Sequence, residues 1–483
     1  MDLGCRCIRR DLPVCILIFR STNTMGNIKR ANLSVDFAKI TGKIKPMHGV
    51  GQPPMTGASD ALFYYLTRAG VPYSRLHDVS GWMGHNLFVD IPNLFRDFDA
   101  DENDPASYDF TFTDKLIEGL MKAKCEPYFR LGVTIENGHM LKAYRIFPPK
   151  DFGKWARICE HVIRHYNEGW ADGYHYGIKY WEIWNEPDDC YKVETAAMWK
   201  GTPEEFFELY SVTAKHLKAC FGDSIKVGGY GHCGLYEFEK DKNLDGIGHE
   251  PTCIYEFVLT FMHDFFKYQK ETGAPIDFFS WHVYDNCHET TAEDFLIIAK
   301  HADYLRRVLD HYGYTKTEHH LNEWNLWTDV KHRKAPRAAA KTLGFMLMMQ
   351  NTSTDVMCIY DAKIGYSAYG PLFNPDTSYP YPTYYTLLMF NSLYQLGNAV
   401  GTESDDKYVF AQAAVNGKKA SLVIANVHQE PVKLSLDIRN FPTGEAEILR
   451  IDEENTYTLT GETLGDELLL PENCCVEIKL FDL

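Results

Sequence analysis

The chain has 483 residues, of which 45% are hydrophobic and 14% aromatic, and its formal net charge is -17. This length exceeds that of a usual single domain, so we expect one large domain and a smaller accessory module. The acidic balance argues against a nucleic-acid partner, because neutralising phosphates needs clustered Lys and Arg residues that the sequence lacks; a neutral or mildly charged small substrate fits better.

Residues 1–29 form a poorly defined N-terminal extension. Three arginines precede an apolar run at residues 12–19, but this run is short, contains Pro13 and lacks a small-residue cleavage site. It therefore fits neither a signal peptide nor a membrane span, and translation from Met25 is an alternative start. No other stretch approaches the roughly 20 apolar residues of a membrane span, so we expect no membrane association.

Thirteen cysteines are scattered along the chain without a repeated CxxC pair or a Cys/His zinc spacing. Their odd number and scatter favour a reduced thiol population, so we expect a cytoplasmic protein. Cys474 and Cys475 are adjacent in a predicted strand, where neighbouring side chains point to opposite faces, and we interpret both as structural.

Residues 30–395 alternate short apolar runs with amphipathic segments, which is the pattern of repeated strand–helix units. The predicted strands lie near Ile44–His48, Tyr73–His77, Glu126–Leu131, Tyr180–Trp184, Lys226–Tyr230, Phe278–His282, His319–Asn322 and Val356–Tyr360. The clearest predicted helices are Phe152–Tyr166, Pro203–Cys220, Tyr255–Thr272, Ala292–Tyr312 and Ala335–Gln350. Eight such units predict an α/β fold, a closed (β/α)8 TIM barrel.

Residues 396–483 change to alternating runs separated by turns, which predicts an accessory C-terminal β-sandwich. The runs Tyr408–Val415 and Lys419–Val427, for example, are joined by an Asn-Gly turn. Residues 30–40, ahead of the barrel, offer a further strand that could pair with this sandwich.

Two glutamates stand out, each in an aromatic-rich motif at the end of a predicted strand. Glu186 lies in Trp-Asn-Glu-Pro and Glu323 in Asn-Glu-Trp-Asn. Barrel enzymes carry their chemistry at the carboxyl ends of the strands. Two carboxyl groups in different surroundings can take different roles in glycoside hydrolysis. One protonates the leaving oxygen, while the other attacks the sugar or activates a water molecule. One buried glutamate could simply form an ion pair, but two such motifs favour a catalytic pair.

Four motifs together resemble glycoside hydrolase family 39, within clan A: residues 42–49 (GKIKPMHG), 184–187 (WNEP), 280–284 (SWHVY) and 322–324 (NEW). Members include β-xylosidases and α-L-iduronidases. The resemblance implies a (β/α)8 barrel with a β-sandwich and a retaining mechanism. It also implies that Glu186 is the general acid/base after the fourth strand and Glu323 the nucleophile on the seventh. Burial and the nearby Glu323 charge should keep Glu186 protonated at neutral pH.

The same resemblance assigns supporting roles to three residues. Asn185 would hydrogen-bond the sugar 2-hydroxyl, Tyr284 would steady the nucleophile, and Arg75 would hold the nucleophile ionised. His282 would line the sugar site or brace its loop. The plain alternatives are a turn asparagine, a core tyrosine and a structural ion pair.

His48 and His77 are predicted to open onto the site from the first two strands, although a core position is as reasonable for each. Arg130 stands where the xylosidases of the family typically present a glutamate. It could grip a uronate carboxylate, or it could pair with an acid such as Glu136.

Sugar faces stack on aromatic rings, and four tryptophans near strand ends are candidates for such a surface. They are Trp82, Trp281, Trp324 and Trp327.

Metal catalysis is a competing hypothesis, because the chain contains 19 histidines and many acids. The adjacent His319 and His320 should face opposite sides of a strand and could not chelate together, and no HExxH motif occurs. We therefore expect no catalytic metal and no other cofactor, while a calcium or other structural ion stays an open alternative.

The sequence thus predicts a retaining, exo-acting glycosidase of a carbohydrate substrate, with a terminal β-linked xylose as the sugar that the resemblance favours. A β-galactoside, an α-L-arabinoside or a uronide remains an alternative, as does a barrel that binds carbohydrate without catalysis. Exo action is suggested by long loops at residues 82–109 and 233–252, which could close a cleft into a pocket. Relatives often form dimers or tetramers, so a homo-oligomer is one of the oligomeric states that the sequence allows.

Overall fold

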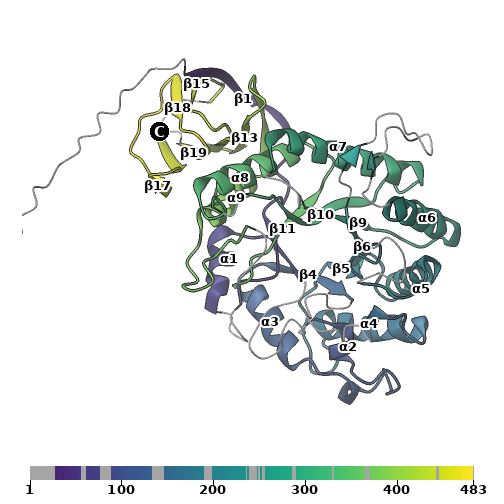
Figure 1. The fold of residues 1–483 in the computed structure, drawn as a ribbon. Coiled ribbons are helices and arrows are strands. Elements are labelled where there is room, and N and C mark those ends of the chain that lie inside the picture. Colours follow the sequence, from purple (N-terminus) through teal and green to yellow (C-terminus); the bar gives the residue numbers. More distant parts are fainter. Residues whose placement is uncertain are drawn as a thin grey trace, which may run out of the picture.

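The computed structural model describes residues 28–55, 61–76, 89–132, 146–189, 198–234, 237–238, 247, 251–252, 256–284, 290–328, 331–364, 370–441 and 445–481. Two modules are visible in Figure 1, a barrel ringed by helices and a curled β-sheet beside it. Within the described residues, every helix is too short or too polar to cross a membrane.

Eight parallel strands close the barrel in the order β10, β11, β2, β3, β4, β5, β6, β9. They are β2 (Gly49–Gly51), β3 (Tyr73–Leu76), β4 (Glu126–Leu131), β5 (Tyr180–Ile183), β6 (Lys226–His232), β9 (Phe278–Tyr284), β10 (Glu318–Asn325) and β11 (Val356–Tyr360). Nearly all their residues are buried, as expected of parallel strands covered on both faces. The predicted (β/α)8 barrel is therefore confirmed.

The first barrel strand lies later than predicted. We expected it at Ile44–His48, but β2 comprises Gly49–Gly51. Glycine is required there because a Cβ on Gly49 would lie 2.6 Å from the carbonyl oxygen of Met357 in β11. Two glycines in three residues give no strand signal, since glycine is depleted in strands. His48 consequently lies at the amino end of β2, opposite to the end where barrel chemistry occurs.

Helices surround the barrel (Figure 1). The α-helices are α1 (Tyr64–Ala69), α2 (Ile91–Leu94), α3 (Thr111–Lys122), α4 (Phe152–Asn167), α5 (Pro203–Phe221), α6 (Glu256–Thr272), α7 (Ala292–His311), α8 (Pro336–Met349) and α9 (Pro382–Leu396). Short 3-10 turns are Ala61–Phe63, Pro105–Ser107 and Gly222–Ser224, and a small hairpin pairs β7 (Glu237–Phe238) with β8 (Pro251–Thr252). Thr202 and Glu205 form a capping box that fixes the start of α5 at Pro203.

Nine strands form the second module, in the order β17, β16, β19, β14, β13, β12, β1, β15, β18. They are β1 (Lys29–Lys43), β12 (Asn398–Ser404), β13 (Val409–Asn416), β14 (Lys419–Asn426), β15 (Val432–Arg439), β16 (Ala446–Ile451), β17 (Thr456–Leu459), β18 (Glu467–Leu470) and β19 (Cys474–Phe481). β1 precedes the barrel in the chain and pairs antiparallel with β12 and parallel with β15. The predicted accessory β-domain is thus present as a curled mixed sheet.

The sheet has a core of its own and also packs on the barrel. Leu33, Leu422 and Cys474 belong to its internal core, whereas Cys475 joins the core shared with the barrel. The two neighbouring thiols therefore face opposite sides of β19, as predicted.

His48 is a core histidine. Its side chain is fully buried, Nε2 lies 3.2 Å from the carbonyl oxygen of Gly70, and its ring packs against Phe390 and Tyr394 of α9. Burial lowers the pKa of the His48 imidazole to about 4, although the hydrogen bond to Gly70 opposes this shift.

Lowering the pH should weaken the fold through His48. The unfolded chain protonates this side chain below about pH 6.5, whereas the folded chain does so only near pH 4. The contribution of neutral His48 to the free energy of unfolding is therefore complete above pH 6.5 and is lost as the pH falls towards 4. For this one group we expect a loss of about 2 kcal/mol between pH 8 and pH 5. Urea unfolding of wild type and His48→Gln at both pH values measures it.

The glutamine variant should lose correspondingly less stability than wild type over that interval. His311→Gln, at the exposed end of α7, is the matched control and should keep the wild-type pH dependence. Identical pH profiles for wild type and His48→Gln would contradict this assignment.

Candidate active site

Glu186 and Glu323 converge at the carboxyl ends of the barrel strands. Glu323 lies within β10 with 5% of its side chain exposed, and Glu186 lies three residues beyond the end of β5 with 13% exposed. A carboxylate oxygen of Glu186 lies within 4.8 Å of a carboxylate oxygen of Glu323. The structure thus brings together the two glutamates that the sequence singled out.

The backbone around Glu186 is held in an uncommon conformation. Trp184 and Glu186 have φ values of 70° and 45°, in the left-handed region that non-glycine residues rarely adopt. The Glu186 amide donates to the carbonyl oxygen of Gly231, at 3.0 Å, which ties the end of β5 to β6. Two residues later, buried Asp188 contacts His232 Nδ1 at 2.5 Å. These contacts stabilise a strained turn that directs the Glu186 carboxylate, and strain of this kind is common at functional sites.

Arg75 of β3 lies beneath the carboxylate pair and is fully buried. Its three nitrogens donate to three different groups. Nη1 donates to Glu323 at 2.6 Å, Nε to Glu182 at 2.7 Å, and Nη2 to the side-chain oxygen of Asn185 at 2.6 Å. The rigid guanidinium fork therefore fixes the relative positions of strands β3, β5 and β10.

Glu182 is a charged member of this group that the sequence analysis did not identify. Besides Arg75, its carboxylate accepts hydrogen bonds from Ser280 at 2.6 Å and from Asn322 at 2.7 Å. Burial alone raises the pKa of Glu182, but the Arg75 guanidinium and these hydrogen bonds outweigh it and hold the pKa below its ordinary value. Glu182 was identifiable in principle, because it shares with Tyr180 the face of β5 that points into the barrel.

Each catalytic candidate has its own hydrogen-bond partners. The Tyr284 hydroxyl donates to the second oxygen of Glu323 at 2.7 Å. His282 Nδ1 lies 2.6 Å from a Glu186 oxygen and 3.9 Å from Glu323, and the Asn185 amide nitrogen lies 3.4 Å from the other Glu186 oxygen. Glu323 therefore accepts from a guanidinium and a hydroxyl, both of which favour its charged form, whereas Glu186 contacts an imidazole and an amide.

A metal ion could in geometric terms be ligated by Glu186, His282 and Glu323, since each offers a ligand atom within 4.8 Å of the others. The Arg75 guanidinium, 2.6 Å from Glu323, already supplies a positive charge to this group. Because Arg75 and the Tyr284 hydroxyl donate to the two oxygens of Glu323, a metal ion would have to displace one of these donors to bind this carboxylate.

The other predicted site residues take different positions. Trp324 points out of the barrel and packs against Phe345 of α8, because it is adjacent to the inward-facing Glu323 in β10. Arg130 is buried on β4, directly opposite Glu182 in the strand register. Trp327 follows β10, lies under the guanidinium of Arg333 and lines the same small hollow as Tyr284. His77, Trp82 and Glu136 lie outside the described residues.

His319 and His320 face opposite sides of β10, as predicted. His320 lies inside the barrel, where Nδ1 is 3.1 Å from the Tyr128 hydroxyl. His319 lies outside, stacked on the ring of Trp281 at 5.5 Å. Trp281 is therefore a packing residue and does not face the carboxylates.

Gln52 is a further residue at the mouth of the barrel that no motif indicated. It follows β2 directly and is fully buried, and its amide nitrogen donates to the Tyr360 hydroxyl at 2.9 Å. The Tyr360 ring lies edge-on to Tyr284, with centroids 6.1 Å apart. Gln52 therefore supports the side of the site that holds the Tyr284 hydroxyl.

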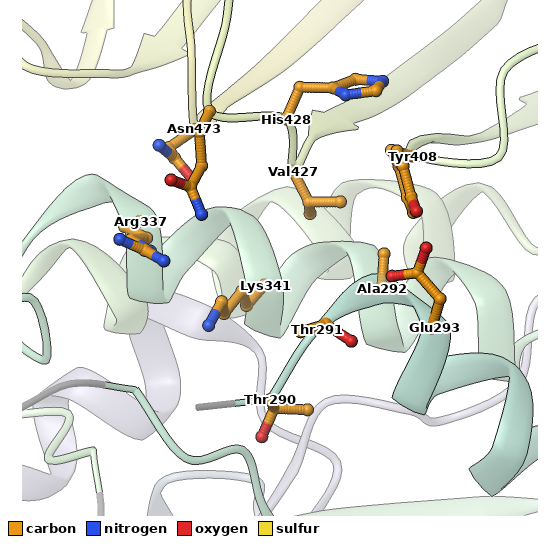
Figure 2. Close-up of a pocket in the computed structure, with 11 residues that line it drawn as sticks. Thr290, Thr291, Ala292, Glu293, Arg337, Lys341, Tyr408, Val427, His428 and Asn473 are labelled. Carbon is orange, nitrogen blue, oxygen red and sulfur yellow. The ribbon is translucent and has the colours of Figure 1, made fainter. Parts of the chain in front are cut away.

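A separate cavity of about 400 Å³ lies where the sheet meets the barrel. Figure 2 shows Arg337 and Lys341 of α8 on its barrel side and loop residues His428 and Asn473 on its sheet side. Neither Glu186 nor Glu323 is among its lining residues, so we assign this cavity no part in the chemistry.

Two known proteins match up to about half of this chain in sequence. A β-xylosidase of Geobacillus stearothermophilus is 27% identical over 213 residues, which are 42% of this chain and 35% of that protein. A β-xylosidase of Caldicellulosiruptor saccharolyticus is 26% identical over 253 residues, 50% of this chain and 42% of that protein. The chain thus matches less than half the length of either relative.

The fold is also shared with solved structures. The crystal structure of a glucosidase from Croceicoccus marinus superposes with a TM-score of 0.73 at 18% identity, covering 95% of this chain and all of that one. The family model for glycosyl hydrolases family 39 matches residues 49–353. This match covers more than half of the chain and includes both glutamates, and the chain therefore belongs to glycosyl hydrolases family 39.

Proposed function

We propose that this protein is a retaining, exo-acting glycoside hydrolase that removes a terminal sugar, with β-linked xylose as the leading substrate. The observation that carries the proposal is the facing pair Glu186 and Glu323, whose nearest oxygens lie within 4.8 Å. Retaining enzymes hold their carboxyl groups about 5 to 5.5 Å apart, whereas inverting enzymes leave about 6.5 to 9.5 Å for a water molecule. The close spacing supports direct attack by one carboxylate on the sugar.

Glu323 is the better nucleophile of the two. Arg75 and Tyr284 donate to its two oxygens at 2.6 and 2.7 Å, which stabilises the ionised form. In the first step a Glu323 oxygen bonds to the anomeric carbon, the glycosidic C–O bond breaks, and Glu186 gives its proton to the leaving oxygen. The product is a glycosyl-enzyme ester with its anomeric configuration inverted.

The second step reverses these roles. Glu186, now ionised, accepts a proton from a water molecule, and the water oxygen bonds to the anomeric carbon as the ester bond to Glu323 breaks. Two inversions give net retention, and both carboxyl groups return to their starting protonation states. His282, 2.6 Å from Glu186, is placed to orient that carboxyl group in both steps.

Asn185 is suited to bind the sugar 2-hydroxyl. Arg75 donates to its side-chain oxygen at 2.6 Å, which fixes the amide so that its nitrogen, a donor, lies on the side of Glu186. A donor held there can bond a hydroxyl next to the reacting carbon, and such contacts strengthen in the transition state.

The choice of sugar rests on the relatives. Two that match in sequence are named β-xylosidases, while a solved structure with the same fold is named a glucosidase. A β-glucoside, β-galactoside, α-L-arabinoside or uronide is therefore an alternative substrate. Removing the nucleophile also tests the remaining alternative, a barrel that binds sugar without catalysis.

Glu323→Gln should lower kcat by at least about 10³-fold, because the amide cannot form the glycosyl-enzyme. In Glu323→Ala, added azide should restore turnover and give the α-glycosyl azide, since azide enters from the vacated face. In Glu186→Ala, azide should give the β-glycosyl azide by attacking the glycosyl-enzyme. NMR of the products distinguishes the two anomers.

The exposed Glu293→Gln is the control for these variants and should retain wild-type kcat. Swapped azide products would reverse the two roles. Full activity of Glu323→Gln would show that this glutamate is not the nucleophile.

Among aryl glycosides, the β-xyloside should give the highest kcat/KM. The β-glucoside carries an extra hydroxymethyl group, and pockets discriminate such small groups by about 10 to 200-fold. The panel should include the β-galactoside, α-L-arabinoside, β-glucuronide and α-L-iduronide. A higher kcat/KM for another member would reassign the sugar, and release of internal fragments from a xylan would exclude exo action.

Glu182→Gln should lower the free energy of unfolding by about 3 kcal/mol, because it leaves the buried Arg75 charge with one carboxylate fewer. The matched change Glu293→Gln breaks an exposed ion pair with Lys407 and should cost less than about 1 kcal/mol. Urea unfolding at pH 7 compares the two variants. Equal losses would mean that Glu182 does not stabilise the arginine.

A further inference from the structure

A group of metal-ligating side chains lies on the outer wall of the barrel, between α4 and α5. These helices are neighbours in the ring around the barrel (Figure 1). Glu160 belongs to α4, whereas His216 and Cys220 belong to α5 and are one helical turn apart, so they share a face. A carboxylate oxygen, an imidazole nitrogen and a thiol sulfur all lie within 4.8 Å of one another.

The three atoms are close to the geometry that a tetrahedral ion requires. Zn²⁺ binds nitrogen, oxygen and sulfur at about 2.0 to 2.3 Å, which separates its ligands by about 3.5 Å. Cys220 Sγ lies 3.8 Å from His216 Nε2, and that nitrogen lies 2.5 Å from Glu160 Oε2. If the long Glu160 side chain rotated so that Oε2 moved about 1 Å away from His216, the three atoms would occupy three corners of a tetrahedron around the ion.

The surroundings permit an ion to enter and balance its charge. The side chains of Glu160 and His216 are 13% and 29% exposed. Arg164 donates to Glu160 Oε1 at 2.7 Å, which leaves Oε2 for the ion and orients the carboxylate in the way that outer partners orient metal ligands. A thiolate and a carboxylate together neutralise a divalent cation, and Glu168 pairs with the Arg164 charge.

We propose that Glu160, His216 and Cys220 form a binding site for Zn²⁺ or a similar borderline-soft divalent cation, with water as the fourth ligand. The site joins two helices of the barrel wall. His216 and Cys220 lie in the last two turns of α5, which leads into the amino end of β6 and is therefore remote from the catalytic face. The ion is structural and takes no part in catalysis.

Cobalt titration of the full-length, reduced and metal-free protein tests this proposal. Co²⁺ replaces Zn²⁺ in such sites, and a bound thiolate gives a charge-transfer absorption band. We expect one equivalent of Co²⁺ to produce this band and one equivalent of Zn²⁺ to abolish it. Cys220→Ser should abolish the band, and His216→Gln or Glu160→Gln should weaken Co²⁺ binding at least about tenfold. His311→Gln, an exposed histidine on α7, is the control and should leave binding unchanged.

Absence of the band in wild type would overturn the proposal. Persistence of the band in Cys220→Ser would place the ion on other thiols and would also overturn it, as would undiminished binding in both His216→Gln and Glu160→Gln. These measurements do not depend on enzymatic activity, so a failure of the metal-site proposal and a failure of the proposed hydrolase function are distinguishable.

A second measurement needs no variant. Zn²⁺ should slow the alkylation of Cys220 in the wild-type protein at least about tenfold, as followed by mass spectrometry of the peptide that contains it. An unchanged alkylation rate at this cysteine would contradict the proposal even if a variant failed to fold.

Discussion

Arg75 donates hydrogen bonds from all three of its guanidinium nitrogens, to Glu182, Asn185 and Glu323. The side chain is withdrawn from water, so its charge has to be balanced within the barrel, and Glu182 and Glu323 provide that balance. Since these acceptors come from β5, the turn after it and β10, one group sets the spacing of elements that are far apart in the sequence. The positions of both candidate catalytic carboxylates depend on it.

The two acids bound to Arg75 are in different positions. Glu182 is enclosed and also accepts from Ser280 and Asn322, so no site remains on it for a substrate. Glu323 is bound on both oxygens but lies at the mouth of the barrel, beside Glu186. The same cation therefore pairs with one enclosed carboxylate and with one that lies beside Glu186 at the mouth of the barrel.

Most of the barrel could be predicted because buried parallel strands are continuous apolar runs and the helices between them are long and amphipathic. β2 could not, because Gly49 and Gly51 are present for close approach to β11 and carry no hydrophobic signal. In the site, Glu186 and Glu323 were recognisable from their motifs. Trp324 was misplaced because a register irregularity of β10 between Leu321 and Glu323, which has no sequence signal, turns Glu323 into the barrel and Trp324 out of it.

The remaining site residues depend on the fold more than on sequence pattern. No sequence feature near Gln52 distinguishes it from any other polar residue. Its position in the site is set by the pairing of β2 with β11, which closes the barrel. Glu182 lies in the same motif as Glu186, but its importance emerges from partners on three other strands. Long-range contacts of this kind have no local signature, so strand alternation can show that Glu182 faces the barrel interior but not which residues it contacts there.

The position of β1 has a consequence for how the molecule is made. β1 is the first strand of the described chain, yet it lies between β12 and β15, and in the described sheet it alone joins the pair β15 and β18 to the other strands. Its neighbours β12 and β15 begin at Asn398 and Val432. During synthesis on the ribosome, the backbone hydrogen-bonding groups on both edges of β1 therefore have no partner strand until the whole barrel has been made. A start at Met25 would leave this strand whole, whereas a start beyond Lys43 would divide the sheet in two.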